Sequence, residues 1–297
     1  MKVLSFGSLN LDHVYAVPHI IRPGETISAR GKELYCGGKG LNQSIAAARA
    51  GLSVCHAGGI GESEGDELLE ILSSNGVDVS LVERRPGPAG HTIIQVDPEG
   101  HNSIIVFGGS NQANTDAYIH SVLDRFQAGD YVILQNEING NAEIIRLARE
   151  KGMKVVLNPS PFDESAAALC PDADFLFVNE TEAQGLTGTA APEEQLSALH
   201  ARFPRAIAVL TLGEHGSRCA EPGGKTYIQE AYLRPAADTT AAGDTFTGYF
   251  LALYAETGDI PAALRAAAMA SSIAVSRPGA APSIPRRDEV DAALAAL

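Results

Sequence analysis

Short apolar segments alternate with amphipathic segments along most of the chain. The apolar runs have the length of buried strands: Val3–Phe6, Val54–Ala57, Tyr131–Leu134, Lys154–Leu157, Phe175–Val178 and Ala206–Leu210. Other segments repeat apolar residues at helical spacing: Leu41–Ala50, Asp66–Ser74, Asp116–Phe126, Ala142–Glu150, Glu193–Arg202, Ala242–Glu256, Ile260–Val275 and Asp288–Leu297. This alternation predicts one α/β domain over residues 1–297, with a mainly parallel central sheet covered by helices on both faces.

Two stretches, residues 13–35 and 90–107, interrupt this alternation. The first contains two β-favouring segments, Val14–Val17 and Thr26–Arg30, around a Pro-Gly turn. The second has the pattern of a hairpin, with a turn at Asp97–Gly100 between two β-favouring runs. Because no helix follows either stretch to cover it, together they predict a small antiparallel sheet outside the main core. Surface decoration and a lid over an active site explain the pattern equally well.

The composition limits the possible partners. Asp and Glu number 36 and Lys and Arg 22, so the formal net charge is −14, which disfavours nucleic acid and anionic membranes as partners. A nucleotide could bind only where local amides, lysines or metal ions overcome this charge. The four cysteines are widely spaced, with no C-x-x-C and no nearby histidine at zinc spacing, and no apolar run is long enough to span a membrane. We therefore expect a soluble cytoplasmic protein.

The strongest local signal for chemistry is the segment Asp238–Gly248, with the sequence DTTAAGDTFTG. Its small residues allow a ligand to approach the backbone, and a helical pattern begins within it. The first amides of a helix are unpaired and carry the positive end of its dipole, so they can bind an anion. Asp244 lies at the same point, where its carboxylate could accept a proton from a substrate hydroxyl. An acidic residue favoured only by the helix dipole explains Asp244 equally well.

A second segment, Cys36–Gln43 (CGGKGLNQ), also opens a predicted helix. It is neither a Walker A loop nor a dinucleotide-binding motif, because the spacing of its glycines differs from both. Taken alone, it indicates only a tight turn between a strand and a helix. However, Asn10 and Asp12 follow the first strand, and together with Asn42 they offer short donors and acceptors that could bind a polyol.

Together these motifs make the chain resemble the PfkB family of carbohydrate kinases, and most closely its ribokinase-like members. An early Gly-Gly-Lys-Gly-x-Asn is followed by a late Asp-Thr-x-Ala-Ala-Gly-Asp-Thr-Phe. Further family motifs lie in the same order along nearly the whole chain: Pro23–Thr26, Leu157–Pro161, Asn179–Ala183, Thr211–Gly216 and Arg277–Ser283. The resemblance implies a ribokinase-like three-layer fold with residues 13–35 and 90–107 as a lid. It also implies ATP-dependent phosphorylation of a small sugar at its primary hydroxyl, with D-ribose as the expected substrate.

The resemblance also assigns roles around the acceptor sugar. Asp244 would take the proton from the sugar hydroxyl, and the amides of Ala241, Ala242, Gly243 and Asp244 would stabilise charge on the transferred phosphoryl group. Such transfer depends mainly on positioning and electrostatic stabilisation. The remaining sugar-binding residues would be Asn10, Asp12, Gly38, Lys39, Asn42 and Glu137. For Lys39, a solvated surface lysine is an equally good explanation.

For ATP, the resemblance implies a site built from the second half of the chain. Its residues would be Asn179, Thr211, Gly213, Gly216, Gly243 and Ala268. Relatives often carry a polar residue at the position of Ala268, so no side-chain hydrogen bond to adenine is expected there. Glu182 would organise Mg²⁺, through water, although an acidic first helical turn alone is the simpler explanation.

A monovalent cation and a second subunit complete the expectations drawn from the family. K⁺ would lie beside the anion hole and be bound mostly by backbone oxygens of Asp238, Thr240, Ala274, Arg277, Gly279 and Ser283. Asp238 is the one carboxylate of this set, and a hard cation is bound by several oxygens. The lids of two chains would pair to form a homodimer.

Two alternative functions remain at the level of sequence. Leu11, Cys36, Asn136 and Gly108–Gln112 depart from the usual ribokinase-like sequence, which leaves a kinase for deoxyribose, fructose, another small sugar or a nucleoside open. A sugar-binding regulator without catalytic activity is disfavoured, because Asp244 and Gly243 are both present.

Overall fold

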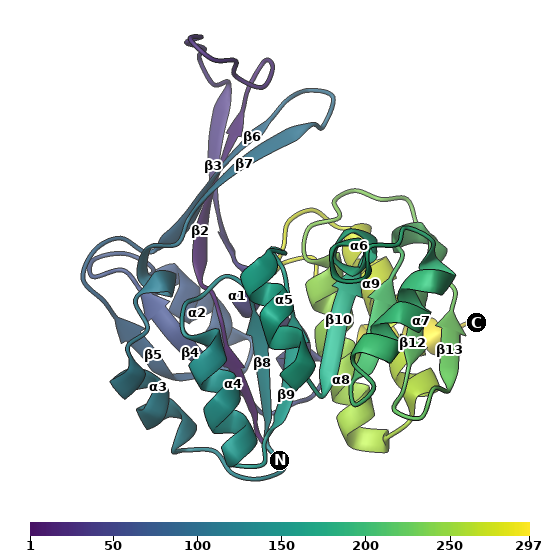
Figure 1. The fold of residues 1–297 in the computed structure, drawn as a ribbon. Coiled ribbons are helices and arrows are strands. Elements are labelled where there is room, and N and C mark those ends of the chain that lie inside the picture. Colours follow the sequence, from purple (N-terminus) through teal and green to yellow (C-terminus); the bar gives the residue numbers. More distant parts are fainter.

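The computed structural model describes residues 1–297, and a nine-stranded sheet forms its centre (Figure 1). The strand order is β13-β12-β11-β10-β9-β8-β1-β4-β5. The bounds are β1 Val3–Phe6, β4 Val54–Ile60, β5 Asp78–Arg84, β8 Tyr131–Gln135, β9 Lys154–Asn158, β10 Phe175–Asn179, β11 Ile207–Thr211, β12 Ser217–Ala220 and β13 Thr226–Gln229. Every pair of neighbouring strands from β5 to β11 is parallel. β12 is antiparallel to both of its neighbours, β11 and β13. The predicted α/β fold with a mainly parallel sheet is confirmed.

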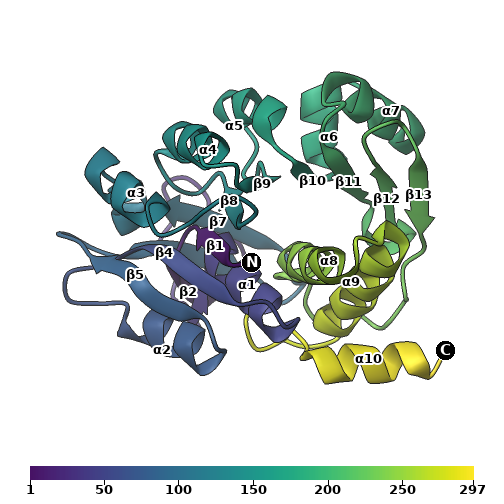
Figure 2. The same cartoon turned by 90° about the horizontal axis from the view of Figure 1, so that it is seen from below.

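Helices cover both faces of this sheet and give the molecule three layers (Figure 2). One layer contains α1 Lys39–Arg49, α2 Asp66–Ser74, α8 Ala242–Thr257, α9 Ile260–Val275 and α10 Arg287–Ala295. The other contains α3 Asp116–Leu123, α4 Asn141–Glu150, α5 Glu164–Leu169, α6 Glu180–Thr187 and α7 Pro192–Arg202. Successive strand residues contribute to separate cores, as Val3 and Leu4 do. The strands are apolar on both faces for this reason, and so they read as continuous apolar runs.

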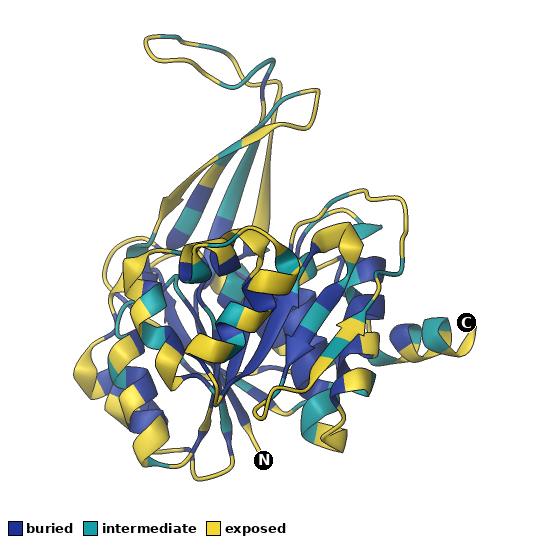
Figure 3. Ribbon diagram, turned by 45° about the vertical axis from the view of Figure 1, so that its right-hand side comes forward, coloured by how far each residue is buried: buried dark blue, intermediate teal, exposed yellow.

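A second, four-stranded sheet stands away from this body (Figure 1). Its strands, in the order β3-β2-β6-β7, are β2 Asn10–Ala16, β3 Gly31–Gly37, β6 Gly90–Val96 and β7 Asn102–Phe107. Two antiparallel pairs, β2 with β3 and β6 with β7, are joined by a parallel pair, β2 with β6. Figure 3 shows exposed residues along much of this projection. The exposed apolar side chains on it are Leu34, Tyr35, Ile93, Ile104, Ile105, Val106 and Phe107.

One strand predicted for this small sheet is wrong. Thr26–Arg30 is not a strand, and the residues that pair with β2 are Gly31–Gly37. The pairing begins where Ala16 faces Gly31, at the end of β2. Residues before Gly31 therefore have no strand beside them, and they form the returning half of a loop.

The order of the strands determines where ligands can bind. β1 lies between β4 and β8, so the chain leaves β1 toward one edge and later continues on its other side. Parallel sheets bind ligands beyond the carboxyl ends of the strands at such a switch point. The small sheet begins just beyond the end of β1, at Asn10. None of the helices has the length and hydropathy needed to cross a membrane.

Candidate active site

Asp244 lies in the first turn of α8, as predicted. The residue before this helix, Ala241, has φ 60° and is the only non-glycine residue with a positive φ. This turn lets the chain enter the helix with the amides of Ala241, Gly243 and Asp244 free of partners within the protein. The amide of Ala242 instead donates to the Thr239 carbonyl at 3.3 Å. Three of the four predicted anion-binding amides are therefore available for a ligand.

Two amide side chains from α1 hold the Asp244 carboxylate. Asn42 Nδ2 donates to Asp244 Oδ2 at 3.0 Å, and Gln43 Nε2 donates to Oδ1 at 2.9 Å. The two helices can approach this closely because Gly248 has no Cβ. A Cβ at this position would lie only 2.5 Å from Ala46 Cβ. Close packing of α1 against α8 thus brings residues about 200 positions apart into direct contact.

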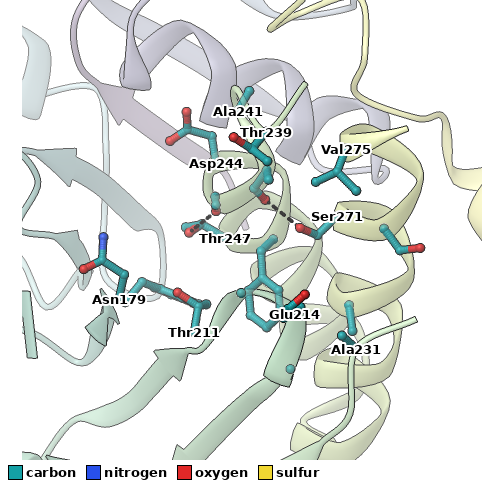
Figure 4. A pocket seen from close by; sticks show the side chains of 18 of the residues that line it. Asn179, Thr211, Glu214, Ala231, Thr239, Ala241, Asp244, Thr247, Ser271 and Val275 are labelled. Atoms are coloured by element: carbon teal, nitrogen blue, oxygen red, sulfur yellow. Dashed lines mark hydrogen bonds between the residues drawn. The ribbon is translucent and has the colours of Figure 1, made fainter. Parts of the chain in front are cut away.

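A cavity of about 710 Å³ opens beside Asp244. Figure 4 shows Asn179 and Thr211, at the ends of neighbouring strands, across this cavity from Asp244 and Ala241. All the residues predicted to bind ATP line it: Asn179, Thr211, Gly213, Gly216, Gly243 and Ala268. Ser271 on α9 donates to the Ala242 carbonyl at 3.1 Å, which fixes the first turn of α8 at the wall of the cavity.

The residues predicted to bind the sugar gather on the side of the small sheet. The Asp12 carboxylate accepts a hydrogen bond from Thr92 Oγ1 at 2.6 Å, and any Cβ at Gly37 would collide with it. Asn10 Oδ1 accepts from Asn111 Nδ2 at 2.7 Å. Burial raises the pKa of Asp12 to about 6, so this acid is costly to ionise in the free protein.

Glu137 and Lys39 lie between this group and the cavity. Glu137 Oε2 accepts from the Lys39 amide at 3.0 Å and from the Ser8 hydroxyl. Burial raises the pKa of Glu137 although the ammonium of Lys39 opposes the shift. Burial lowers the pKa of Lys39, but the carboxylates of Asp244, Glu137 and Glu182 outweigh it and leave the pKa raised. Lys39 lines the cavity and is therefore no solvated surface lysine.

Comparison with known proteins shows the family of the chain. Residues 1–287 match the model of the pfkB family carbohydrate kinases. The chain belongs to this family. Ribokinase of Haemophilus influenzae is 34% identical to it over 95% of each chain, and ribokinase of Staphylococcus aureus is 34% identical over 98% of each. The structure of Arabidopsis thaliana ribokinase complexed with ribose and ATP has a TM-score of 0.88 and 31% identity, covering 99% of this chain and 98% of that one.

In this pfkB family kinase, the residues predicted to bind K⁺ lie next to Thr239 and Val275, which line the cavity. Five are on two adjoining loops, before α8 and after α9, and Ala274 is in the last turn of α9. Asp238 joins the loops, because Oδ1 accepts from the Thr240 amide at 2.9 Å and Oδ2 from the Gly279 amide at 2.9 Å. The Arg277 guanidinium pairs with Glu289 at 2.8 Å, so its side chain is committed to α10. The carboxylate and the backbone carbonyls of Thr240, Ala274, Arg277, Gly279 and Ser283 are a donor set that fits a hard monovalent cation.

Glu182, the residue predicted to organise Mg²⁺, lies in the first turn of α6 and caps this helix. Asn179 and Glu182 form a capping box at the start of α6, with hydrogen bonds of 2.9 and 3.0 Å. Both residues line the cavity of this pfkB family kinase, and so does Glu180. Glu182 Oε2 caps the helix, which leaves Oε1 for the water shell of a cation. An acidic, oxygen-rich wall suits Mg²⁺.

The site of this pfkB family kinase also contains polar residues to which the sequence assigned no role: Ser8, Gln43, Thr92, Asn111, Gln135 and Asn158. Gln43 belongs to the Cys36–Gln43 motif and directly follows Asn42 on α1. Neighbouring helix residues point about 100° apart, so spacing alone did not suggest that both would reach one carboxylate. Thr92 could have been found from strand pairing, since it faces Asp12 in the register of β2 and β6.

Proposed function

We propose that this protein transfers the γ-phosphoryl group of ATP to the primary hydroxyl of D-ribose, giving ribose 5-phosphate and ADP. The observation that carries the proposal is the position of Asp244. Its carboxylate borders the cavity proposed for ATP. It also accepts a hydrogen bond from Asn42 on α1, one of the residues predicted to bind the sugar. The similarity to ribokinases over nearly the whole chain supports the same assignment.

The reaction follows from the groups around Asp244. The carboxylate would take the proton of the ribose O5 hydroxyl while O5 forms a bond to the γ-phosphorus of ATP. The bond from that phosphorus to the bridging oxygen breaks, and ADP leaves with the electron pair. The free amides of Ala241, Gly243 and Asp244 would stabilise the charge that develops on the phosphoryl oxygens.

An orphaned acceptor supports a ligand rich in hydroxyl groups. Asn42 Oδ1 is buried and has no hydrogen-bond partner, although Nδ2 of the same side chain is bound to Asp244. A buried unpaired carbonyl is unfavourable unless a ligand donates to it. A ribose hydroxyl would satisfy it, and Asn10, Asp12, Gly38, Lys39 and Glu137 would bind the other hydroxyls.

The cavity would hold ATP, with its phosphates directed at α8. Thr211, Gly213 and Gly216 would contact phosphate and ribose, and Ala268 would pack against the adenine. Lys39 would contribute positive charge between the two substrates. Mg²⁺ held near Glu182 and Asn179 would neutralise phosphate charge, and K⁺ bound by the two loops at Asp238 would order the nearby amides.

The small sheet, residues 10–37 and 90–107, is proposed as the lid of a single kinase domain. Asn10, Asp12 and Thr92 lie at its base, where it would cover a bound sugar. Its exposed apolar side chains lie along the same strands, around and beyond the register of Asp12 and Thr92, and would be buried by the lid of a second chain. We propose a homodimer on this basis, acting in the cytoplasm, the compartment that supplies ATP.

A substrate panel tests the proposed function. Initial rates would be measured with ATP, Mg²⁺ and K⁺ for D-ribose, 2-deoxyribose, fructose and a set of nucleosides. We expect the highest kcat/KM for D-ribose, and phosphorus NMR should place the product phosphate on O5. A higher kcat/KM for another acceptor would replace ribose by that acceptor. No turnover with any acceptor, despite binding of sugar and ATP, would favour a regulator.

A further inference from the structure

Asp244 receives a hydrogen bond from Gln43, a residue to which the proposed function assigns no substrate contact. The Gln43 side chain is fully buried, and its Nε2 donates to Asp244 Oδ1 at 2.9 Å and to Asn158 Oδ1 at 3.3 Å. Its Oε1 accepts from Gln135 Nε2 at 2.7 Å. Every polar atom of this side chain is therefore engaged within the protein.

The neighbours of Gln43 leave its carboxamide only one orientation. Asn158 Nδ2 donates to the Phe177 carbonyl at 3.0 Å, so Asn158 presents its oxygen to Gln43. Asp244 also presents an acceptor, and Gln135 presents a donor. If the Gln43 carboxamide were rotated by 180°, its oxygen would face the acceptor oxygens of Asp244 and Asn158. Its NH₂ group would then face the NH₂ group of Gln135. The Asp244 carboxylate and Asn158, which the Phe177 carbonyl orients, thus fix the direction in which the Gln43 N–H points.

Gln135 is buried as completely as Gln43 but makes fewer hydrogen bonds. It is the last residue of β8, it is fully buried, and its Oε1 would collide with any Cβ at Gly7. That oxygen has no hydrogen-bond partner. A buried amide that leaves an acceptor unpaired is unfavourable, and its one side-chain hydrogen bond is the one to Gln43. The arrangement is explained if the purpose of Gln135 is to orient Gln43.

We propose that Gln43 is the positioning residue for the base Asp244, and that Gln135 acts through it. This proposal rests on the proposed function. Asn42 keeps its Oδ1 free for a ligand, whereas every polar atom of the Gln43 side chain is engaged within the protein. Gln43 holds Oδ1, while Oδ2 accepts only the hydrogen bond from Asn42 and keeps a second lone pair for the proton of the sugar hydroxyl. The bond also favours the ionised carboxylate, the form that acts as a base.

Other charged groups also face Asp244, and they set the background for any pH dependence. Lys39 on α1 and Glu137 beyond β8 both interact with its charge, and Glu182 on α6 interacts with Lys39. None of them contacts Gln43 or Gln135 by a hydrogen bond. Substitution of Gln43 by a residue of similar shape therefore changes one donor to Asp244 and leaves these charges in place.

The test compares Gln43→Met, Gln135→Met and the double variant with the wild type. We expect Gln43→Met to lower kcat about tenfold to a hundredfold, the effect of losing a hydrogen bond to a charged group, while KM for ribose and ATP stays within about twofold. The acid limb of the profile of kcat against pH should move to higher pH, because a donor to the carboxylate is lost. Gln135→Met should lower kcat less, and it should add nothing to Gln43→Met.

Gln195→Met is the matched control. Gln195 is also a buried glutamine, and it donates to the carbonyls of Glu180 and Thr189. It should lower the thermal midpoint without moving the pH profile. If Gln43→Met likewise lowers only the midpoint and keeps kcat and the profile of the wild type, Gln43 has no positioning role. Additive effects of the two substitutions would remove Gln135 from the proposal.

A crystal structure of Gln43→Met distinguishes failure of this proposal from failure of the proposed function. Absence of sugar phosphorylation by the wild type would refute the proposed function but not the positioning role of Gln43. The orientation of the Asp244 carboxylate would still decide the question of positioning. We expect it to rotate away from its wild-type orientation, and an unchanged carboxylate would overturn the role of Gln43.

Discussion

At the scale of single residues, Asp244 is the position on which the proposed chemistry depends most. Asp244→Asn keeps the shape of the side chain but removes the base. We expect kcat to fall by about 10²–10⁴, the typical contribution of a general base. Binding of ribose and ATP, measured by calorimetry, should change little. Full turnover by this variant would exclude Asp244 as the base.

Asp12 offers a prediction that depends on pH. Its pKa is raised to about 6 by burial, so the folded protein binds this proton more tightly than the unfolded chain does. Ionisation of Asp12 therefore lowers the free energy of unfolding progressively as pH rises from about 4 to about 6, and above that range the loss is complete.

Asp12→Asn should remove this loss of stability, since the amide cannot ionise. Without ligand, the variant should melt at a higher temperature than the wild type at pH 8, and the difference should shrink at pH 5. Scanning calorimetry at the two pH values measures it. The same stability difference at both values would show that burial of the Asp12 charge is not the cause.

At the scale of elements, the two glycines of α8 should respond in opposite ways to a methyl group. A Cβ at Gly243 meets nothing within 4 Å, whereas a Cβ at Gly248 meets Ala46 at 2.5 Å. Gly248→Ala should therefore lower the free energy of unfolding by about 1–3 kcal/mol through overpacking.

Gly243→Ala should fold as stably as the wild type, because alanine favours a helix. Its methyl group would occupy space needed by the phosphoryl group, so kcat should fall about a hundredfold through misplacement. Chemical unfolding and steady-state kinetics of the two variants separate these effects. Wild-type kcat in a stable Gly243→Ala protein would show that the start of α8 does not face the transferred group.

The two loops joined by Asp238 lead to a prediction for K⁺. With K⁺, the melting temperature and kcat of the wild type should both exceed their values in Na⁺ alone. Asp238→Asn should lose both responses, because it removes the carboxylate of the donor set. Melting curves need no turnover and therefore test cation binding independently of activity. Equal activity of the wild type in Na⁺ and K⁺, in buffer free of K⁺ contamination, would contradict the proposed site.

The element scale also shows what sequence could and could not predict. Long periodic segments were located accurately, since α2 and α9 have the predicted bounds. The sequence did not predict the short strand β12 or the edge strand β13, because they carry Arg218, Lys225 and Thr226 in or beside them and do not form apolar runs. Thr26–Arg30 has strand composition, but whether it pairs depends on where β2 ends, and that is set in three dimensions.

The same distinction holds within the site. Asp244 and Asn42 could be predicted because each lies in a recognisable motif. Gln135 could not be assigned a role, since only the pairing of β8 beside β1 brings it to Gln43 on α1. Contacts between distant segments are a property of the sheet order, and no local pattern encodes them.

At the scale of the whole molecule, the small sheet predicts the oligomeric state. Val106 and Ile104, both exposed, point to the same face of β7 as successive alternate residues. Replacing both by Lys should convert a dimer into a monomer, because it places charge in the apolar contact. Light scattering after gel filtration measures this. Ile228→Lys is the matched control, since Ile228 is also exposed but lies on β13, in the other sheet. A wild-type monomer would refute the proposed dimer.

The close packing of α1 against α8 has a consequence for how fast a sugar can bind. Asn42, Gln43 and Asp244 contact one another before any ligand arrives, so these groups need no rearrangement after encounter. Association should then be limited by diffusion into the site and by the position of the small sheet. The slow events of each turnover would be opening of that sheet and departure of the product. The small sheet would then set the turnover rate, while the residues on α1 and α8 carry out the phosphoryl transfer.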